Sequence, residues 1–295
     1  MQRDSIANTL VVAAGVCLVC SLFVSTAAVG LRDMQQKNIA LDMKKNILQA
    51  AGFTPDQLGS SSDVESLYDT RVEPIIIDLA TGERATDKLV SADEKFNSDQ
   101  QALADYDQIK TAKDAKSLDE GLSRKLTAEE NTAGVSNVEI YSHVYLVKGE
   151  DGKISKYVFP VRGKGLWSIL KGFIAVDNDF DTIAGLTYYE HAETPGLGGE
   201  VDAKWWKDLW RDPDNPKKLF GENGQVVIEV VKGAAEPNDE YAVDGLSGAT
   251  ITSRGVTNML KFWMGPKGFG PFMEKQKSLE MKTASNPTTS IREGY

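Results

Sequence analysis

An uncharged apolar run near the N-terminus sets the first constraint on how this chain can fold. The run extends over residues 10–31, and 22 helical residues span about 33 Å, enough to cross a hydrocarbon core of about 30 Å. We therefore favour an uncleaved transmembrane helix. The alternative is a cleaved signal peptide ending near Ala27 and Ala28, but the run is longer than a usual signal h-region and only Arg3 precedes it as a basic residue.

The basic residues around this run do not decide the orientation of the helix. One basic residue precedes the run, and four follow it closely: Arg32, Lys37, Lys44 and Lys45. A literal positive-inside count places the large domain in the cytoplasm, although large domains can translocate regardless of such charges. The side of the membrane therefore stays open at this point.

Composition excludes several kinds of site. The net charge of −10, from 33 Lys and Arg against 43 Asp and Glu, leaves no basic excess for binding nucleic acid. Cys17 and Cys20 are the only cysteines and lie in the apolar run, where small packing residues are favoured over a partner-facing metal role. His143 and His191 are too few for a histidine-built metal site, so any redox chemistry requires a bound cofactor.

The sequence predicts five regions along the chain. They are a short N-terminal tail (1–9), the transmembrane helix (10–31), a membrane-proximal helical and mixed region (32–136), the main domain (137–280) and a disordered polar tail (281–295). Within the second half of the membrane-proximal region, residues 81–136 are poor in large apolar side chains, which predicts peripheral, solvated helices. Residues 72–79 read as a strand, and Pro74 places that strand at an edge or at a strand start.

The main domain contains alternating strand and turn signals. Asp151-Gly152 is a hairpin turn signal, and β-branched runs predict strands at 154–161, 169–176, 183–189 and 226–231. An amphipathic helix carrying Trp205, Trp206 and Trp210 is predicted between the last two strands. The fold class that we expect is therefore α+β, a mainly antiparallel sheet with packed helices, preceded by one N-terminal transmembrane helix. The order of the strands is not specified.

A glycine-containing turn at residues 244–250 opens the last clear helix, on which Val256, Leu260 and Trp263 recur at apolar spacing. Such a turn leaves backbone N–H groups free at the helix start, where the helix dipole favours an anion such as a phosphate. The Thr250 hydroxyl would point at that anion, with Arg254 one turn further on. The alternative is that Ser247 or Thr250 only caps the helix.

Two more glycine-rich segments, at 163–168 and 193–199, also follow predicted strands. Loops of this kind allow close approach to a flat ligand and tend to converge at one edge of a sheet. Trp167 and Leu197 are candidates for apolar contact with an aromatic ring system, and Glu193, Thr194 and Lys232 are candidates for its polar edges. The alternatives are that Trp167 lies in the core, that Glu193 is a solvated loop acid and that Lys232 is a surface charge.

These motifs resemble the FMN-binding domain of respiratory membrane complexes. The resemblance rests on Gly163-Lys164-Gly165-Leu166-Trp167, on His191-Ala192-Glu193-Thr194-Pro195-Gly196-Leu197-Gly198, and on Asp244-Gly245-Leu246-Ser247-Gly248-Ala249-Thr250. With the N-terminal span and the insertion before the hairpin, the chain is similar to the C subunits of Na+-translocating NADH:quinone oxidoreductases over nearly its whole length. The G subunits of the Rnf ferredoxin:NAD complex share the flavin motif and are the second possibility.

The resemblance implies a covalent cofactor. FMN would be joined through its phosphate to Thr250, making the chain a phosphoprotein and a flavoprotein, and a separate flavin transferase using FAD would form the bond outside the cytoplasm. The same resemblance implies that the flavin is surrounded by residues from all three loops: Trp167, Glu193, Thr194, Gly196, Leu197, Lys232, Asp244, Leu246, Ser247, Gly248 and Ala249.

The resemblance also implies a function. The chain would be an electron-relay subunit of a bacterial inner-membrane complex that couples NADH oxidation and quinone reduction to Na+ export, with its soluble domain on the periplasmic side. No G-x-G-x-x-G follows a strand, and one span offers no ion path, so the NADH site and the ion path belong to partner subunits. A membrane-anchored binding or assembly module without redox turnover is the alternative from another functional class.

Overall fold

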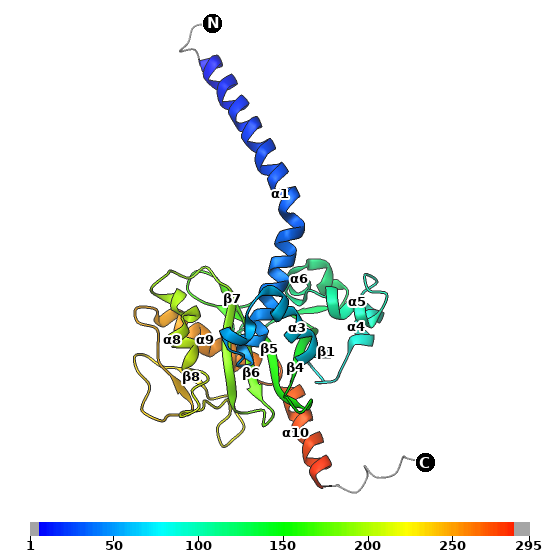
Figure 1. Cartoon of the computed structure of the whole chain (residues 1–295), viewed down its shortest axis with the longest axis vertical. Coiled ribbons are helices and arrows are strands. Elements are labelled where there is room, and N and C mark those ends of the chain that lie inside the picture. Colours follow the sequence, from blue (N-terminus) through cyan, green and yellow to red (C-terminus); the bar gives the residue numbers. More distant parts are fainter. Residues whose placement is uncertain (1–5, 286–295) are drawn as a thin grey trace. The chain divides into compact units, whose positions relative to one another are not determined.

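The computed structural model describes residues 6–285 and divides the chain into two compact units, residues 1–43 and 44–295. The first unit is the exposed part of helix α1 (Ile6–Ala50), which has 45 residues (Figure 1). Among the described residues, α1 is the helix that is long and apolar enough to cross a membrane. The structure thus confirms the predicted apolar helix, while residues 1–5 of the predicted tail lie outside the described part.

A five-stranded antiparallel sheet forms the centre of the second unit. Its strands are β1 (Val72–Asp78), β4 (Tyr141–Lys148), β5 (Ile154–Lys164), β6 (Ile169–Asp177) and β7 (Ile183–Glu190), in the order β1-β4-β5-β6-β7. The predicted strands at 72–79, 154–161, 169–176 and 183–189 are confirmed, and Pro74 lies on an edge strand as expected. The antiparallel α+β class is likewise confirmed.

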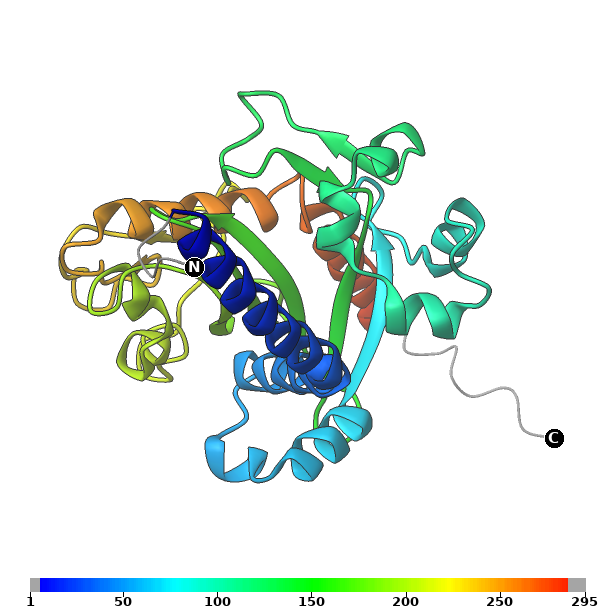
Figure 2. The same ribbon diagram turned by 90° about the horizontal axis from the view of Figure 1, so that it is seen from above.

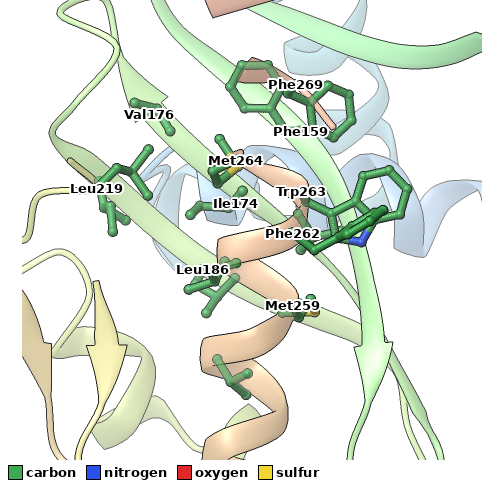
Figure 3. Packing of buried hydrophobic residues seen from close by; sticks show 14 of the residues in the cluster. Phe159, Ile174, Val176, Leu186, Leu219, Met259, Phe262, Trp263, Met264 and Phe269 are labelled. Carbon is green, nitrogen blue, oxygen red and sulfur yellow. The ribbon is translucent and has the colours of Figure 1, made fainter. Parts of the chain in front are cut away.

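Helices α9 (Thr250–Trp263) and α10 (Gly270–Ser285) cover one face of this sheet. Figure 3 shows the side chains of α9 and the following turn packing against strands of the sheet, with Phe269 beside Phe159 at a ring-centroid distance of 4.9 Å. Val256, Leu260 and Trp263 are all fully buried, which confirms their predicted role as the apolar stripe of this helix. This packing holds the start of α9 at a defined place on the sheet.

The other face of the sheet is covered by the end of α1, followed by α2 (Pro55–Leu58) and α3 (Ser61–Arg71). Ile47 and Leu48 are buried there, and the Thr187 hydroxyl on β7 donates a hydrogen bond of 3.2 Å to the Asn46 carbonyl. Side chains alternate between faces along each strand, so a strand in a sheet covered on both sides buries successive side chains. Strands β4, β5 and β6 are buried along most of their length, and the buried residues include the polar Ser142, His143 and Arg162.

The segment before the hairpin folds into short helices and a small ladder. These elements are α4 (Thr86–Ala92), α5 (Asp99–Asp105), α6 (Gln108–Lys113), α7 (Ala115–Asp119), β2 (Ser123–Lys125) and β3 (Asn137–Glu139). Figure 2 shows these helices beside β1, away from the segment that carries residues 191–250. The predicted helices are present, but the segment also has its own small core, in which Leu89, Phe96 and Tyr106 pack with Ile76.

Two predicted elements are much shorter than the sequence indicates. In place of a strand at 226–231, only β8 (Glu229–Val230) forms, and it pairs in parallel with β9 (Ala242–Val243). Residues before β8 instead fold back on the preceding chain, where the Val227 amide donates to the Leu219 carbonyl. The tryptophan helix is reduced to the 3-10 turn η1 (Gly198–Asp202) and α8 (Lys204–Asp208).

The C-terminal region differs from the predicted polar tail. Helix α10 continues to Ser285, five residues into the range assigned to the tail, and its first turns bury Phe272 and Met273. The chain also divides at 43/44 rather than at 136/137, so residues 44–136 belong to the same compact unit as the main domain. The rest of the predicted tail, residues 286–295, lies outside the described residues.

Candidate functional site

The turn at 244–250 places an exposed threonine hydroxyl at the start of α9. Thr250 is the first helical residue and is exposed, while the N-cap position is occupied by Ala249, which makes no side-chain cap hydrogen bond. The interpretation of Ser247 or Thr250 as a capping residue is therefore wrong. Within the described chain, the N–H groups of Thr250, Ile251 and Thr252 have no hydrogen-bond acceptor, so three donors remain available there.

The three glycine-rich loops converge, as predicted, and the Glu193 carboxylate joins them. It accepts hydrogen bonds from the backbone amides of Leu166 (3.2 Å), Trp167 (2.9 Å) and Ser168 (3.0 Å) in the first loop. It also accepts one of 2.7 Å from the hydroxyl of Thr252, on the helix that follows the third loop. Glu193 is only 5% exposed, so it is not the solvated loop acid of the alternative interpretation.

These hydrogen bonds determine the ionisation of Glu193. Burial by itself would raise the pKa of the carboxyl, but the hydrogen bonds from Thr252 and from the amides of Trp167, Ser168 and Leu166 lower it, and the net pKa lies below its usual value. The carboxylate is therefore ionised near neutral pH, with its oxygens already engaged. In the structure the carboxylate fixes the loops, and the predicted contact of Glu193 with a ligand stays a prediction.

Two glycines allow this close approach of the loops to α9. A Cβ atom on Gly255 would lie 2.2 Å from the Lys164 carbonyl oxygen at the end of β5. A Cβ atom on Gly198 would lie 2.6 Å from the Thr252 hydroxyl and 2.7 Å from a Glu193 carboxylate oxygen. All three distances are too short for a side chain, so glycine is required at both positions where the helix meets the two loops.

A cavity of about 200 Å³ opens beside Thr250. Its walls are formed by the chain around β8 and by the first turns of α9, and they bring Lys232, Leu246, Thr250 and Arg254 together. Leu246 is buried, whereas the other three residues are exposed. Thr250 and Lys232, which the sequence predicts for one site, thus line the same cavity.

The other predicted residues divide into surface and framework positions. Trp167 is 69% exposed and Leu197 is 43% exposed, so the alternative of a core tryptophan is wrong. Four further predicted residues are exposed on the second and third glycine-rich loops: Thr194, Gly196, Ser247 and Gly248. The exposed ring of Trp167 and the side chain of Leu197 offer apolar surface to a flat ligand.

Two further predicted residues lie within the framework of the loops, and Asp244 braces it through hydrogen bonds. The Asp244 carboxylate accepts a hydrogen bond of 2.8 Å from the Ala235 amide, and its carbonyl accepts one of 2.9 Å from the Trp206 indole. Ala249 is buried at the start of α9. Asp244 therefore supports the loops, and the predicted contacts of Asp244 and Ala249 with the flavin stay predictions.

Sequence reasoning missed three buried hydroxyls that shape the site. Thr252 binds Glu193, Ser253 accepts from the Leu246 amide at 3.1 Å, and Thr257 accepts from the Val230 amide at 2.8 Å. All three lie on α9, where they are buried among the apolar residues of the helix. Hydroxyls inside an apolar helical stripe were the available signal, because buried polar groups need partners.

Comparisons with known proteins agree with this geometry. The model of the FMN-binding domain family matches residues 165–265, which include most of the first loop, the other two loops and α9. The C subunit of the Na+-translocating NADH-quinone reductase of Vibrio parahaemolyticus is 45% identical, and the match covers 93% of this chain and 96% of the relative. The C subunit from Yersinia pestis is 40% identical, and the match covers 95% of this chain and 97% of the relative. The chain belongs to this family of C subunits.

Solved structures support the same assignment. NqrC from Shewanella oneidensis aligns with a TM-score of 0.67 and 32% identity over 80% of this chain and 96% of that structure. The corresponding C subunit from Parabacteroides distasonis aligns with a TM-score of 0.58 and 28% identity over 82% and 96%. Of the two families that share the flavin motifs, the NqrC family is the one supported, and the chain carries its FMN-binding domain.

Proposed function

We propose that this chain is an electron-relay subunit that carries FMN as a phosphoester on Thr250. The observation that carries the proposal is the exposed Thr250 hydroxyl at the first position of α9, beside free amides and a cavity that contains Lys232. A helix start with free N–H groups favours an anion, and phosphate is the part of FMN that can form an ester with a hydroxyl.

The residues around Thr250 fit the two ends of FMN. The amides of the first turn are suited to the phosphate, Lys232 is suited to a polar edge of the ring, and the exposed Trp167 and Leu197 offer apolar surface for the ring. When bound, FMN supplies one-electron and two-electron redox chemistry, which no side chain of this domain provides. The ester tether keeps the cofactor at high local concentration even where noncovalent affinity is modest.

The remaining parts of the activity belong to partner subunits. The proposed complex couples NADH oxidation and quinone reduction to Na+ export, and this chain supplies one redox step within it. Helix α1 serves as a single-pass anchor in the bacterial inner membrane, with the domain on the periplasmic side. There a flavin transferase using FAD reaches Thr250, whose exposure meets the requirement for modification by another protein.

Flavin fluorescence after denaturation tests the proposal. The chain is produced together with the transferase, separated on a denaturing gel and viewed under ultraviolet light. The wild-type band and the Thr132→Ala control, which removes an exposed threonine hydroxyl outside the three glycine-rich loops, should fluoresce, and Thr250→Ala should be dark. A dark wild-type band would reject covalent FMN and favour a non-redox binding or assembly module.

A further inference from the structure

We propose that the cavity beside Thr250 binds the phosphate end of the flavin nucleotide and that Arg254 is the positioning residue for that phosphate. This inference rests on the proposed function, since it concerns the group that Thr250 receives. It assigns a role to a side chain that neither the family motif nor the ring-lining loops include.

The helix geometry brings Arg254 to the modified hydroxyl. Arg254 follows Thr250 by four residues on α9, and residues at this spacing lie on the same face with about 6 Å between their Cβ atoms. Both residues line the same cavity, and both are exposed. A long arginine side chain can therefore reach a phosphate held at the Thr250 hydroxyl.

The charge balance of the cavity favours an anion. Within residues 6–285, neither Arg254 nor Lys232 forms an ion pair or a side-chain hydrogen bond. The acidic residue of the cavity, Glu229, has its carboxylate 4.0 Å from the Lys261 ammonium. The cavity thus has two cations that are not paired with a protein anion, against one carboxylate that is paired with Lys261, and this balance favours positive potential next to Thr250.

Arginine suits this role chemically. Its guanidinium presents a planar set of donors that binds two phosphate oxygens at once, whereas a lysine acts as a point charge. During attachment, the Thr250 oxygen forms a bond to the flavin-side phosphorus of FAD and the bond from that phosphorus to the AMP phosphate breaks. AMP leaves, and the hydroxyl proton is released. Arg254 holds the phosphate oxygens in place while the Thr250 oxygen attacks.

The rate of flavin attachment tests this role. The full-length chain is purified without the transferase, then mixed with transferase and FAD, and in-gel fluorescence is followed with time. Arg254→Gln should slow attachment by about ten-fold, which corresponds to roughly 1.4 kcal/mol. The attachment rate of Arg254→Lys should lie between those of the wild type and Arg254→Gln. Lys125→Gln removes an equal charge from an exposed residue of β2 outside the cavity and should match the wild type.

A binding measurement separates a phosphate contact from a structural effect. In the Thr250→Ala background no ester can form, so noncovalent affinity for FMN and for riboflavin, which lacks the phosphate, is measured directly. Adding Arg254→Gln should weaken FMN binding several-fold and leave riboflavin binding unchanged. Equal effects on both ligands, or no effect on either, would overturn the inference.

The failure of this inference is distinguishable from the failure of the proposed function. If the wild-type chain remains dark with transferase and FAD, the proposed function fails and the role of Arg254 fails with it. If the wild type becomes fluorescent and Arg254→Gln is labelled at the same rate, only the role of Arg254 is overturned.

Discussion

The Glu193 carboxylate holds the three glycine-rich loops in one arrangement. Its oxygens accept hydrogen bonds from three consecutive backbone positions, residues 166–168, and from the Thr252 hydroxyl. A carboxylate is suited to this position because it only accepts hydrogen bonds and can accept several. The position of the exposed Trp167, which follows β5, therefore depends on the buried Glu193, which follows β7.

Replacing this acceptor should loosen the loops. Glu193→Gln puts an amide donor against backbone donors, and each buried group left unpaired costs about 1–3 kcal/mol. The expected fall in Tm is roughly 3–10 °C for a unit of this size. Glu190→Gln is the control, because Glu190 is exposed and its ion pair with Lys171 lies at the surface, where such pairs contribute little.

The pH dependence gives this prediction a direction. Because the pKa of Glu193 is lower in the folded chain than its ordinary value, its stabilising contribution is present above that ordinary value and is lost as the pH falls through the folded pKa. The difference in Tm between wild type and Glu193→Gln should therefore shrink at acid pH. A difference that stays constant from neutral pH to well below the pKa of a free glutamate would contradict this role.

Lys232 offers a second test at the scale of one residue. It lines the cavity beside Thr250 without an ion pair in the described structure, so it is available to the flavin. Lys232→Ala should change the flavin spectrum or shift its reduction potential to a more negative value, because removing a cation disfavours the reduced, more negative flavin. Attachment to Thr250 should remain. A redox titration that superimposes on the wild type would remove Lys232 from the site.

The sequence indicated the exposed residues of the candidate site, whose contacts with FMN stay predictions, but not the hydrogen bonds of the buried residues beneath them. Thr250, Lys232 and Trp167 could be proposed for this site because the glycine motifs and the family resemblance point to them. The bracing roles of Glu193 and Asp244 could not, because their partners lie on other loops and become neighbours only through the fold. A carboxylate in a loop has the same local sequence signal whether it meets a ligand or backbone amides.

At the scale of elements, His143 attaches the helices before the hairpin to the sheet. Its ring lies 3.2 Å from the Gln108 side-chain oxygen and 3.3 Å from the Leu103 carbonyl, and it stacks on Tyr145. Burial lowers the pKa of His143 to about 4, although the Leu103 carbonyl and Asp107 act in the opposite direction. The ring is therefore neutral in the folded chain near pH 7.

This burial predicts a loss of stability on mild acidification. The unfolded chain takes up a proton at His143 below about pH 6.5, and the folded chain only near pH 4, so stability should fall by on the order of 3 kcal/mol across that interval. His143→Phe should remove this slope while lowering stability at all pH values. Denaturant unfolding on either side of the ordinary histidine pKa measures both, and an equal pH slope in the variant would assign the effect to other groups.

Element predictions succeeded where periodicity was long and failed where it was short. Strands β5, β6 and β7 bury apolar residues over eight to eleven positions, and α9 has a continuous apolar stripe. By contrast, the β-branched run at 226–231 forms a strand of only two residues, because its first part pairs back onto Leu219 and Phe220. Such short-range folding competes with strand pairing and has no distinct sequence period.

At the scale of the whole molecule, the boundary between the two compact units lies inside one helix. Residues 44–50 of α1 belong to the second unit and bury Ile47, Leu48 and Ala50. The apolar pattern of the anchor was visible in the sequence. That the same helix contributes to the core of the domain depends on contacts with β7, such as the bond from Thr187 to Asn46, which only the fold reveals.

Two truncations test where the folded domain begins. A chain that starts at Lys44 should be soluble without detergent and unfold within a few degrees of the full-length protein. A chain that starts at Thr54 loses three large buried side chains, Ile47, Leu48 and Phe53, each worth about 2–5 kcal/mol, and its Tm should fall by about 15 °C or more. Equal stability of the two truncated chains would show that the end of α1 does not stabilise the domain.

The central claim is that Thr250 carries FMN through its phosphate, and peptide mass spectrometry tests it most directly. The full-length chain is produced with the flavin transferase and digested, and the peptide that contains Thr250 is sequenced by fragmentation. The account predicts a mass increase equal to one FMN less one water, located on Thr250. An unmodified Thr250 peptide, or the flavin on any other residue, would contradict it.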